Sequence, residues 1–187
     1  MIESKIYERI DFTVNPLPRD EYDSCSFLNC NFYNAELSHI TFRDCKFENC
    51  DFSLAKLKNT GLNNIQFAGC KLLGVLFNEC NQFLLSVEFE NCMLKLAVFN
   101  KLKLKKTHFK NCNLEEADFT ETELTSTLFD NCDFRRAIFH KTTLDKSDFR
   151  TSINYSIDPE NNNIRKAKFS ISGVVGLLDK YDIDIQY

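Results

Sequence analysis

Large apolar residues recur at every fifth position along most of the chain. These positions, which we call centres, hold Phe or Leu, and a small residue usually stands two positions before each centre. A centre and the small residue before it point to the same side of an extended backbone, because side chains alternate along a strand. The remaining positions are mostly polar, as expected for turns and an outer surface. A period of five fits neither a helix nor a long flat strand, so the pattern predicts short extended segments joined by turns.

A longer repeat of twenty residues contains four such fives and is clearest over residues 87–146. Repetition at a fixed spacing is typical of a solenoid, in which equivalent positions stack on successive coils. One predicted column of stacked centres is Phe27, Phe47, Phe67, Phe89, Phe109, Phe129 and Phe149, and the matching ladder of small residues is Cys30, Cys50, Cys70, Cys92, Cys112 and Cys132. Stacked strands lie ~4.8 Å apart, so this column predicts a rod roughly 29 Å long.

The repeat is interrupted once and changes at both ends. Phe77 and Phe89 are twelve residues apart instead of ten, which indicates a two-residue insertion within 78–88. We expect residues 1–24 to be a lead-in and N-terminal cap, residues 25–169 to be the rod, and residues 170–187 to be a C-terminal cap and dimerisation segment. Within that last segment the pattern predicts a short helix with Ser172 as its N-cap and then a strand with one apolar face.

Several five-residue units have a small residue, then Asp or Asn, then Phe or Leu. Examples are Cys50-Asp51-Phe52, Cys112-Asn113-Leu114 and Ala117-Asp118-Phe119. Over about residues 25–150 the chain resembles the pentapeptide-repeat family. The resemblance implies a right-handed, four-sided β-helix, so we expect an all-β solenoid of about seven coils with a short C-terminal helix and strand.

The segment from Leu177 to Ile185 resembles the C-terminus of the Qnr and MfpA type within that family. This resemblance implies a terminal element that joins two rods end to end. It also implies rods that imitate DNA, bind DNA gyrase or topoisomerase IV and protect these enzymes from quinolones. The expected dimer interface consists of Leu177, Leu178, Ile183, Ile185 and Tyr187.

The composition narrows the possible partners and locations. A net charge of −4 is mild and gives no reason to expect direct binding of nucleic acid. The first residues carry charges and lack the apolar stretch of a signal peptide, and no stretch is long enough to span a membrane. The nine cysteines are odd in number and lie at core positions, where Cys behaves as a small apolar residue. We therefore expect reduced thiols in a cytoplasmic protein.

No catalytic, metal-binding or phosphate-binding site is predicted along the chain. His39, His108 and His140 take outward positions on different coils, and the pair Glu115-Glu116 lies on a convex exterior that offers no cleft. The chain has no CxxC pair for zinc and no glycine-rich phosphate loop. We expect neither a cofactor nor a metal, and we do not expect an enzyme.

Outward charges alternate in sign from coil to coil. Examples are the column of Lys95, Glu115 and Arg135, the column of Lys101, Glu121 and Lys141, and the column of Glu90, Lys110, Asp130 and Arg150. Opposite charges on adjacent strands contribute roughly 0.2–1 kcal/mol a pair. We therefore predict that these charges hold the coils in register.

A group of apolar residues at outward positions does not fit this scheme. Its members are Leu73, Leu76, Met93, Leu96 and Val98, together with Phe83 and Leu85 of the inserted stretch. An exposed apolar group suggests a partner, but the insertion or the lead-in could equally cover it. Two functions stay open, a protein-interaction scaffold and a DNA mimic that binds gyrase.

Overall fold

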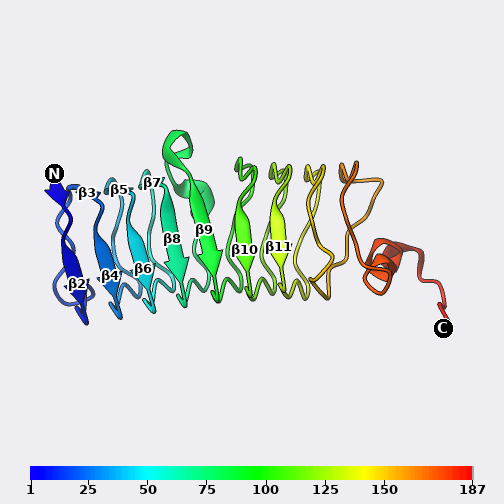
Figure 1. The fold of residues 1–187 in the computed structure, drawn as a ribbon, viewed down its shortest axis with the longest axis horizontal. Helices are drawn as coiled ribbons and strands as arrows, with labels where there is room; N and C mark the ends of the chain where they lie inside the picture. The colour runs from blue at the N-terminus through cyan, green and yellow to red at the C-terminus, as the bar shows by residue number, and fades with distance from the viewer. Residues whose placement is uncertain (187) are drawn as a thin grey trace.

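Short parallel strands stack along one axis in the computed structural model, which describes residues 1–186 (Figure 1). The strands are β1 (Ile2–Glu3), β2 (Ile6–Glu8), β3 (Glu21–Asp23), β4 (Ser26–Leu28), β5 (Thr41–Arg43), β6 (Lys46–Glu48), β7 (Gly61–Asn63), β8 (Ile65–Ala68), β9 (Val87–Glu90), β10 (His108–Lys110) and β11 (Leu128–Asp130). The helical elements are the 3₁₀ turns η1 (Phe77–Glu79), η2 (Gln82–Leu84), η3 (Val174–Leu177) and η4 (Asp179–Tyr181).

Four ladders of parallel pairs run along the rod and define four sides, named here in chain order. Side A is the seven-stranded sheet in the order β11-β10-β9-β8-β6-β4-β2, and side D begins as the four-stranded sheet β1-β3-β5-β7. Side B is a ladder of single bridges from Asp11 to Ile153, and side C is a ladder that includes Leu76↔Val98 and Asp118↔Ile138. Single bridges such as Lys103↔Glu123 continue side D beyond β7. The predicted parallel β-solenoid is therefore confirmed.

The twenty-residue register is visible in the phenylalanine column on side A. Phe27 pairs with Phe47, and Phe89 pairs with Phe109. Phe67 pairs with Phe89 across twenty-two residues, which confirms the two-residue insertion. The added length forms η1 and η2, and Figure 1 shows this connection between β8 and β9 projecting from one long edge of the rod.

The core is built from the centres, which point into the rod from all four sides. Seven of them form the predicted column, and each ring stacks on the next: the Phe89 and Phe109 centroids are 5.0 Å apart and those of Phe109 and Phe129 are 5.1 Å apart. Rings of neighbouring sides meet edge to face, as Phe99 and Phe109 do at 90°. Stacked and edge-to-face pairs are both favourable aromatic geometries, so every ring of the column is held along the rod and across it.

The cysteines of the predicted ladder are buried thiols beside this column. Each donates to a carbonyl oxygen of the preceding coil: Cys70 Sγ lies 3.3 Å from the Phe47 oxygen and Cys132 Sγ lies 3.4 Å from the Phe109 oxygen. Thr122 and Ser152 make the same contact from equivalent positions, each at 2.9 Å. Cys is thus one of three small donors that satisfy the same class of backbone oxygen.

Most corners between two sides contain a residue with a left-handed backbone. In one coil these residues are Asn91, Leu96, Lys101 and Lys106, with φ between 54° and 62°. Asn tolerates this region, but Leu and Lys adopt it at a cost. The N–H of Leu96 bonds to the Glu115 oxygen at 2.9 Å, and the N–H of Lys101 bonds to the Thr120 oxygen at 3.0 Å. These bonds to the next coil offset the cost.

Both ends of the chain differ from the sequence-based expectation. Residues 1–24 are part of the rod, because β2 pairs with β4 and β1 pairs with β3 in the common register. The C-terminal helix consists of two 3₁₀ turns, and the N-cap of η3 is Gly173 rather than Ser172. The predicted C-terminal strand is wrong, since residues 182–186 have no strand structure. Among the described residues, no helix has the length and apolar character needed to cross a membrane.

Candidate interaction surface

The five apolar residues predicted at outward positions of the rod lie together. Their exposed fractions are 39% for Leu73, 41% for Leu76, 51% for Met93 and 44% for Leu96, while Val98 is half-buried. Met93 lies on side B, Leu76 pairs with Val98 on side C, and Leu73 and Leu96 occupy the corner between these sides. We call these five residues the central patch.

Leu54 extends the central patch by one coil and was not predicted. It is 48% exposed and adopts φ 60° at the corner between sides B and C. A side-chain carbon on Gly74, one coil further on, would lie 3.1 Å from Leu54 Cδ2, so the Leu54 side chain covers that glycine. Leu54, Gly74 and Leu96 follow one another at the coil period, with the two-residue insertion counted in the second step. This regular spacing places Leu54 in the same column as Leu96 and could have identified it from the sequence.

A network of charges ends the central patch on its C-terminal side. Lys95 Nζ lies 3.2 Å from Glu115 Oε1, and Arg136 Nη2 lies 2.7 Å from the same oxygen. Arg136 also pairs with Glu116. Lys95 first and Arg136 second hold the pKa of the Glu115 carboxyl below its usual value. The corner that is apolar in the middle coils therefore becomes fully charged one coil later.

The insertion does not lie on the same sides as the central patch. Its η2 turn packs against β7 on side D, where Leu84 approaches Gly61. Phe83 is fully exposed at the tip, and Leu85 is half-buried against the core. The structure thus separates the seven predicted residues into a patch of five on sides B and C and a pair on side D, of which Phe83 projects and Leu85 packs against the core. Neither the insertion nor the lead-in covers the exposed members of the patch.

The C-terminal segment docks on the last coil through ion pairs. Lys180 Nζ lies 2.7 Å from Asp158 Oδ1 and 2.5 Å from Glu160 Oε2, and the Tyr181 hydroxyl donates to Glu160 at 3.0 Å. Lys180 is the first cause that lowers the pKa values of both Asp158 and Glu160. Charge therefore helps to hold this segment, which we call the cap, on the last coil.

The predicted dimer residues are distributed over this cap. Leu177 and Leu178 are half-buried, whereas Ile183 is 55% exposed and Ile185 is 39% exposed. Tyr187, the fifth predicted residue, lies outside the described residues. A shallow groove of about 240 Å³ runs between Leu178 and Ile183.

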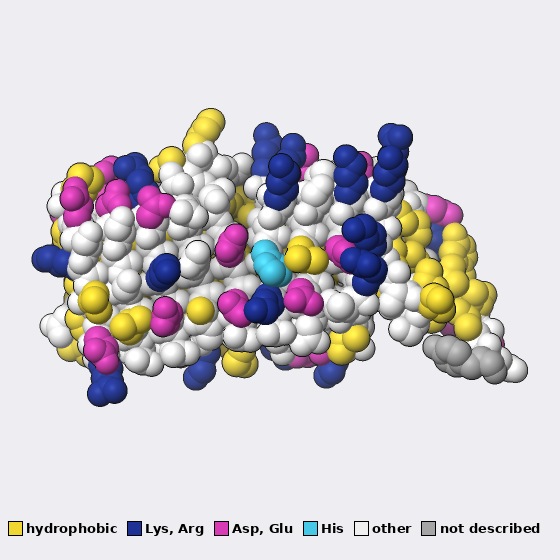
Figure 2. Space-filling view, in the orientation of Figure 1, with side chains coloured by type: hydrophobic (Ala, Val, Ile, Leu, Met, Phe, Trp, Pro, Cys, Tyr) yellow, Lys and Arg dark blue, Asp and Glu magenta, His cyan; other side chains and the backbone are white. Residues whose placement is uncertain are grey.

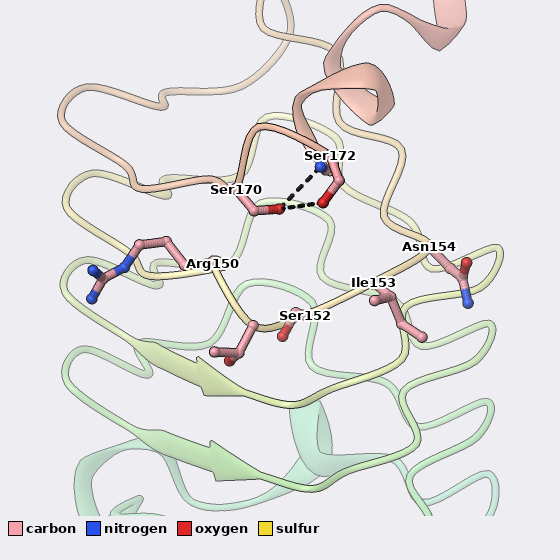
Figure 3. Close-up of a pocket in the computed structure, with 8 residues that line it drawn as sticks. Arg150, Ser152, Ile153, Asn154, Ser170 and Ser172 are labelled. Carbon is pink, nitrogen blue, oxygen red and sulfur yellow. Dashed lines mark hydrogen bonds between the residues drawn. The ribbon is translucent and has the colours of Figure 1, made fainter. Parts of the chain in front are cut away.

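A second groove, of about 310 Å³, separates the last complete coil from the cap (Figure 3). Ser170 and Ser172 lie on one wall with their hydroxyl oxygens 3.2 Å apart, and Arg150 and Asn154 point away to opposite ends. The Arg150 guanidinium is held by Asp148, with Nη2 2.8 Å from Oδ2. The buried Ser152 hydroxyl donates to the Phe129 oxygen. These groups are already bonded to neighbours, and the groove presents no nucleophile with an adjacent base.

The alternating charge columns form ion pairs in part. Lys110 pairs with Glu90 at 2.7 Å across adjacent coils, as predicted. Arg150 instead pairs with Asp148 of its own coil, because the side chain of Asp148 also accepts the Arg150 N–H. Within residues 1–186, Lys101, Glu121 and Lys141 form no ion pair. Figure 2 shows both signs interspersed over the middle of the rod.

The groups that could carry chemistry are dispersed or buried. His39 and His140 are exposed, and His108 is half-buried on β10. Burial raises the pKa of the Cys45 thiol to about 12, which makes this thiol a poor nucleophile. No group of three or more His, Cys, Asp and Glu side chains suited to a metal occurs in the described part of the chain.

Comparison with known proteins identifies a repeat family and a set of similar folds. A family model described as a pentapeptide repeat region matches residues 21–82 and 83–156. Among solved structures, full-length QnrB1, described as a plasmid-mediated fluoroquinolone resistance protein, aligns with a TM-score of 0.63 and 17% identity over 97% of this chain and 99% of that chain. A trypsin-treated form of QnrB1 aligns with a TM-score of 0.50 and 19% identity over 99% and 97%. No curated protein sequence matches the chain.

Proposed function

Because the chain belongs to the pentapeptide repeat family, we propose that it is a non-enzymatic rod that binds a protein partner through its central patch. The observation that carries this proposal is the exposure of Leu73, Leu76, Met93 and Leu96 on adjoining coils. Single exposed apolar residues are common, but a contiguous group on a regular polar surface indicates a contact site.

The surroundings of the central patch support this proposal. Stacked coils form a filled, convex rod, so binding through a surface is favoured over binding in a cavity. The charge network of Lys95, Glu115 and Arg136 borders the patch. An apolar centre with a polar rim is the usual composition of a protein–protein interface.

Aspartate substitutions within the central patch test the proposal. Leu76→Asp and Val98→Asp should abolish capture of the partner, because each places a charge in an apolar interface. Ile138→Asp is the matched control, since Ile138 continues the same ladder on side C and is 50% exposed. Affinity capture with quantitative mass spectrometry would compare the four proteins. The proposal fails if both patch variants retain every protein that the parent and the Ile138→Asp control retain.

A gyrase-directed function is the second candidate. It is favoured by the alignment with QnrB1 along nearly the whole of both chains. The charges argue against DNA mimicry, since a mimic needs one sign along its length and Lys110 and Glu90 neutralise each other. A gyrase supercoiling assay with and without a quinolone, at two salt concentrations, tests this candidate. Inhibition or drug protection that weakens at high salt would support it, and no effect at micromolar protein would exclude it.

We further propose a two-fold dimer through the C-terminal ends, in the cytoplasm. Exposed Ile183 and Ile185 beside the groove at Leu178 support the dimer. The free state of all nine cysteines fits a reducing compartment. Deletion of residues 182–187 should give a monomer by light scattering, and an unchanged mass would refute this dimer.

A further inference from the structure

A second surface, on side D and its two corners, carries an excess of positive charge. Its exposed cations are Lys101, Lys103, Lys105, Lys106, Lys141, Lys146, Arg165 and Lys166. We call this set the basic edge. Only Glu121, Glu123 and Asp145 lie among these cations, so the edge has a net charge of +5 while the chain as a whole has −4. Figure 2 shows dark-blue side chains standing along one long edge of the rod, beyond the projecting insertion.

The cations of the basic edge do not serve to hold the coils together. Lys105 pairs with Glu123 at 2.8 Å, and none of the other seven forms an ion pair within residues 1–186. Lys106, Lys146 and Lys166 occupy one corner column, with Lys146 and Lys166 on adjacent coils. Like charges on adjacent strands are destabilising, so register alone does not explain this column.

The ends of the basic edge provide two features that a ligand can use. Near the C-terminal end, a groove of about 280 Å³ is lined by Asp145, Lys146, Arg165 and Lys166. Asp145 Oδ1 accepts the backbone N–H of Arg165 at 3.0 Å, and the Arg165 guanidinium forms no ion pair within the described residues. At the opposite end the fully exposed Phe83 precedes the coil of Lys103. Four coil steps of ~4.8 Å separate these features by about 19 Å, the length of an extended segment of about six residues.

We propose that the basic edge binds an extended, acidic protein segment that carries one apolar side chain. Its carboxylates pair with the corner lysines and enter the groove at Arg165, while the apolar side chain contacts Phe83. This inference rests on the proposed function only in that the partner is a protein, and it uses a surface other than the central patch.

The charge of the remaining surface favours a short acidic segment over a nucleic acid. Outside the basic edge the chain has a net charge of −9, given its total of −4. The adjoining side A does not continue the positive charge, because Lys110 pairs with Glu90 and Arg150 pairs with Asp148. A long polyanion would extend beyond the edge onto a surface of net negative charge and be repelled, whereas a segment as short as the edge avoids it.

Fluorescence anisotropy with a labelled oligoglutamate peptide that carries one leucine tests the proposal. The combined reversal Lys106→Glu, Lys146→Glu and Lys166→Glu should weaken binding about tenfold or more. Phe83→Ala should weaken binding of the leucine peptide but not that of a peptide without leucine. The matched control reverses Lys56, Lys58 and Lys71, which are exposed, unpaired within residues 1–186 and outside the edge. This control makes the same change in total charge and should retain most of the affinity.

Three results would overturn the proposal. The first is no binding to the parent protein or an equal loss in both triple variants. The second is tighter binding of duplex DNA than of the peptide, which would identify a general polyanion surface. The third is salt-sensitive self-association that only the corner reversal removes, which would assign the edge to a second copy of the chain. Leu76→Asp and Val98→Asp should leave peptide binding unchanged, so failure of the central patch and failure of the basic edge are distinguishable.

Discussion

At the scale of single residues, the aromatic rings have no room to relax. Phe109 is completely buried and stacks between Phe89 and Phe129 while meeting Phe99 edge to face. The backbone of each coil is fixed by hydrogen bonds to the coils on both sides. A cavity in such a core cannot collapse, because the flanking coils cannot approach each other.

Phe109→Ala should therefore lower the free energy of unfolding by roughly 3–5 kcal/mol. Chemical denaturation of the parent and the variant measures the difference. Leu128→Ala is the control, since Leu128 is 40% exposed at an outward position on β11 and should change stability by about 0.5 kcal/mol or less. A loss under about 1 kcal/mol for Phe109→Ala would contradict the packing described here.

The cysteines should be chemically inert in the folded protein. All nine are buried, and burial raises the pKa of Cys45 to about 12. The thiolate is the reactive form, so a thiol reagent at about pH 8 should label the native protein slowly and the denatured protein completely. Cys132→Ser should be tolerated, because Ser152 makes the same bond to a carbonyl oxygen. Rapid labelling without denaturant would show that the coils open more readily than the packing implies.

At the scale of the elements, some corners contain residues whose left-handed backbone lowers the stability of the rod. Leu96 adopts φ 60°, whereas Asn91 occupies an equivalent corner of the same coil with φ 54°. Because Asn adopts this conformation more readily than Leu, Leu96→Asn should raise stability by about 1 kcal/mol or less. The melting temperatures of the two proteins would show the change. A decrease would mean that Leu96 stabilises the rod through contacts with the other residues of the central patch.

The docking of the C-terminal cap depends on Gly176. A side-chain carbon there would collide with the Tyr155 carbonyl oxygen, and the Gly176 oxygen accepts the Ile157 N–H at 2.9 Å. Gly176→Ala should displace the cap and leave the rod folded. Hydrogen exchange should then increase for residues 174–181 and change little in β10 and β11. Ile171→Ala, at a position 93% exposed in the same segment, is the control and should have no effect.

The elements that sequence could predict are those whose residues repeat. Phe67 and Phe89 made the register and the insertion predictable, because every coil requires a buried centre at this position. The predicted C-terminal strand is wrong, since Ile183 and Ile185 have no strand partner within residues 1–186. Residues 1–24 were expected to be a lead-in, although Tyr22 continues the register. The central patch followed from the inward and outward alternation, but the position of Phe83 depends on how η2 folds onto side D, which no period encodes.

At the scale of the whole molecule, carboxylates with lowered pKa values are distributed from one end to the other. Asp20 lies beside the N-terminal amine, Glu115 beside Lys95, Asp148 beside Arg150, and Asp158 and Glu160 beside Lys180. A lowered pKa in the folded state contributes stability that is present above the ordinary values of 3.8 and 4.5 and is lost as pH falls further.

Stability should therefore be constant near neutral pH and decrease below about pH 4.5. The decrease should be modest and smaller at high salt, because these ion pairs lie at the surface of the rod, where salt screens their interactions. Thermal melts across this pH range at two ionic strengths would measure it. Stability that rises on acidification would mean that repulsion among the acidic side chains outweighs the ion pairs.

The insertion at η1 and η2 adds residues while Phe67 and Phe89 keep the same partnership as every other coil. Chain length and rod shape are thus independent where the chain crosses side D. Evolution can lengthen such a connection without redesigning the core, and the coil that carries the new loop determines where along the rod the loop meets a partner. The specificity of such a rod can change by small local edits while its architecture is inherited intact.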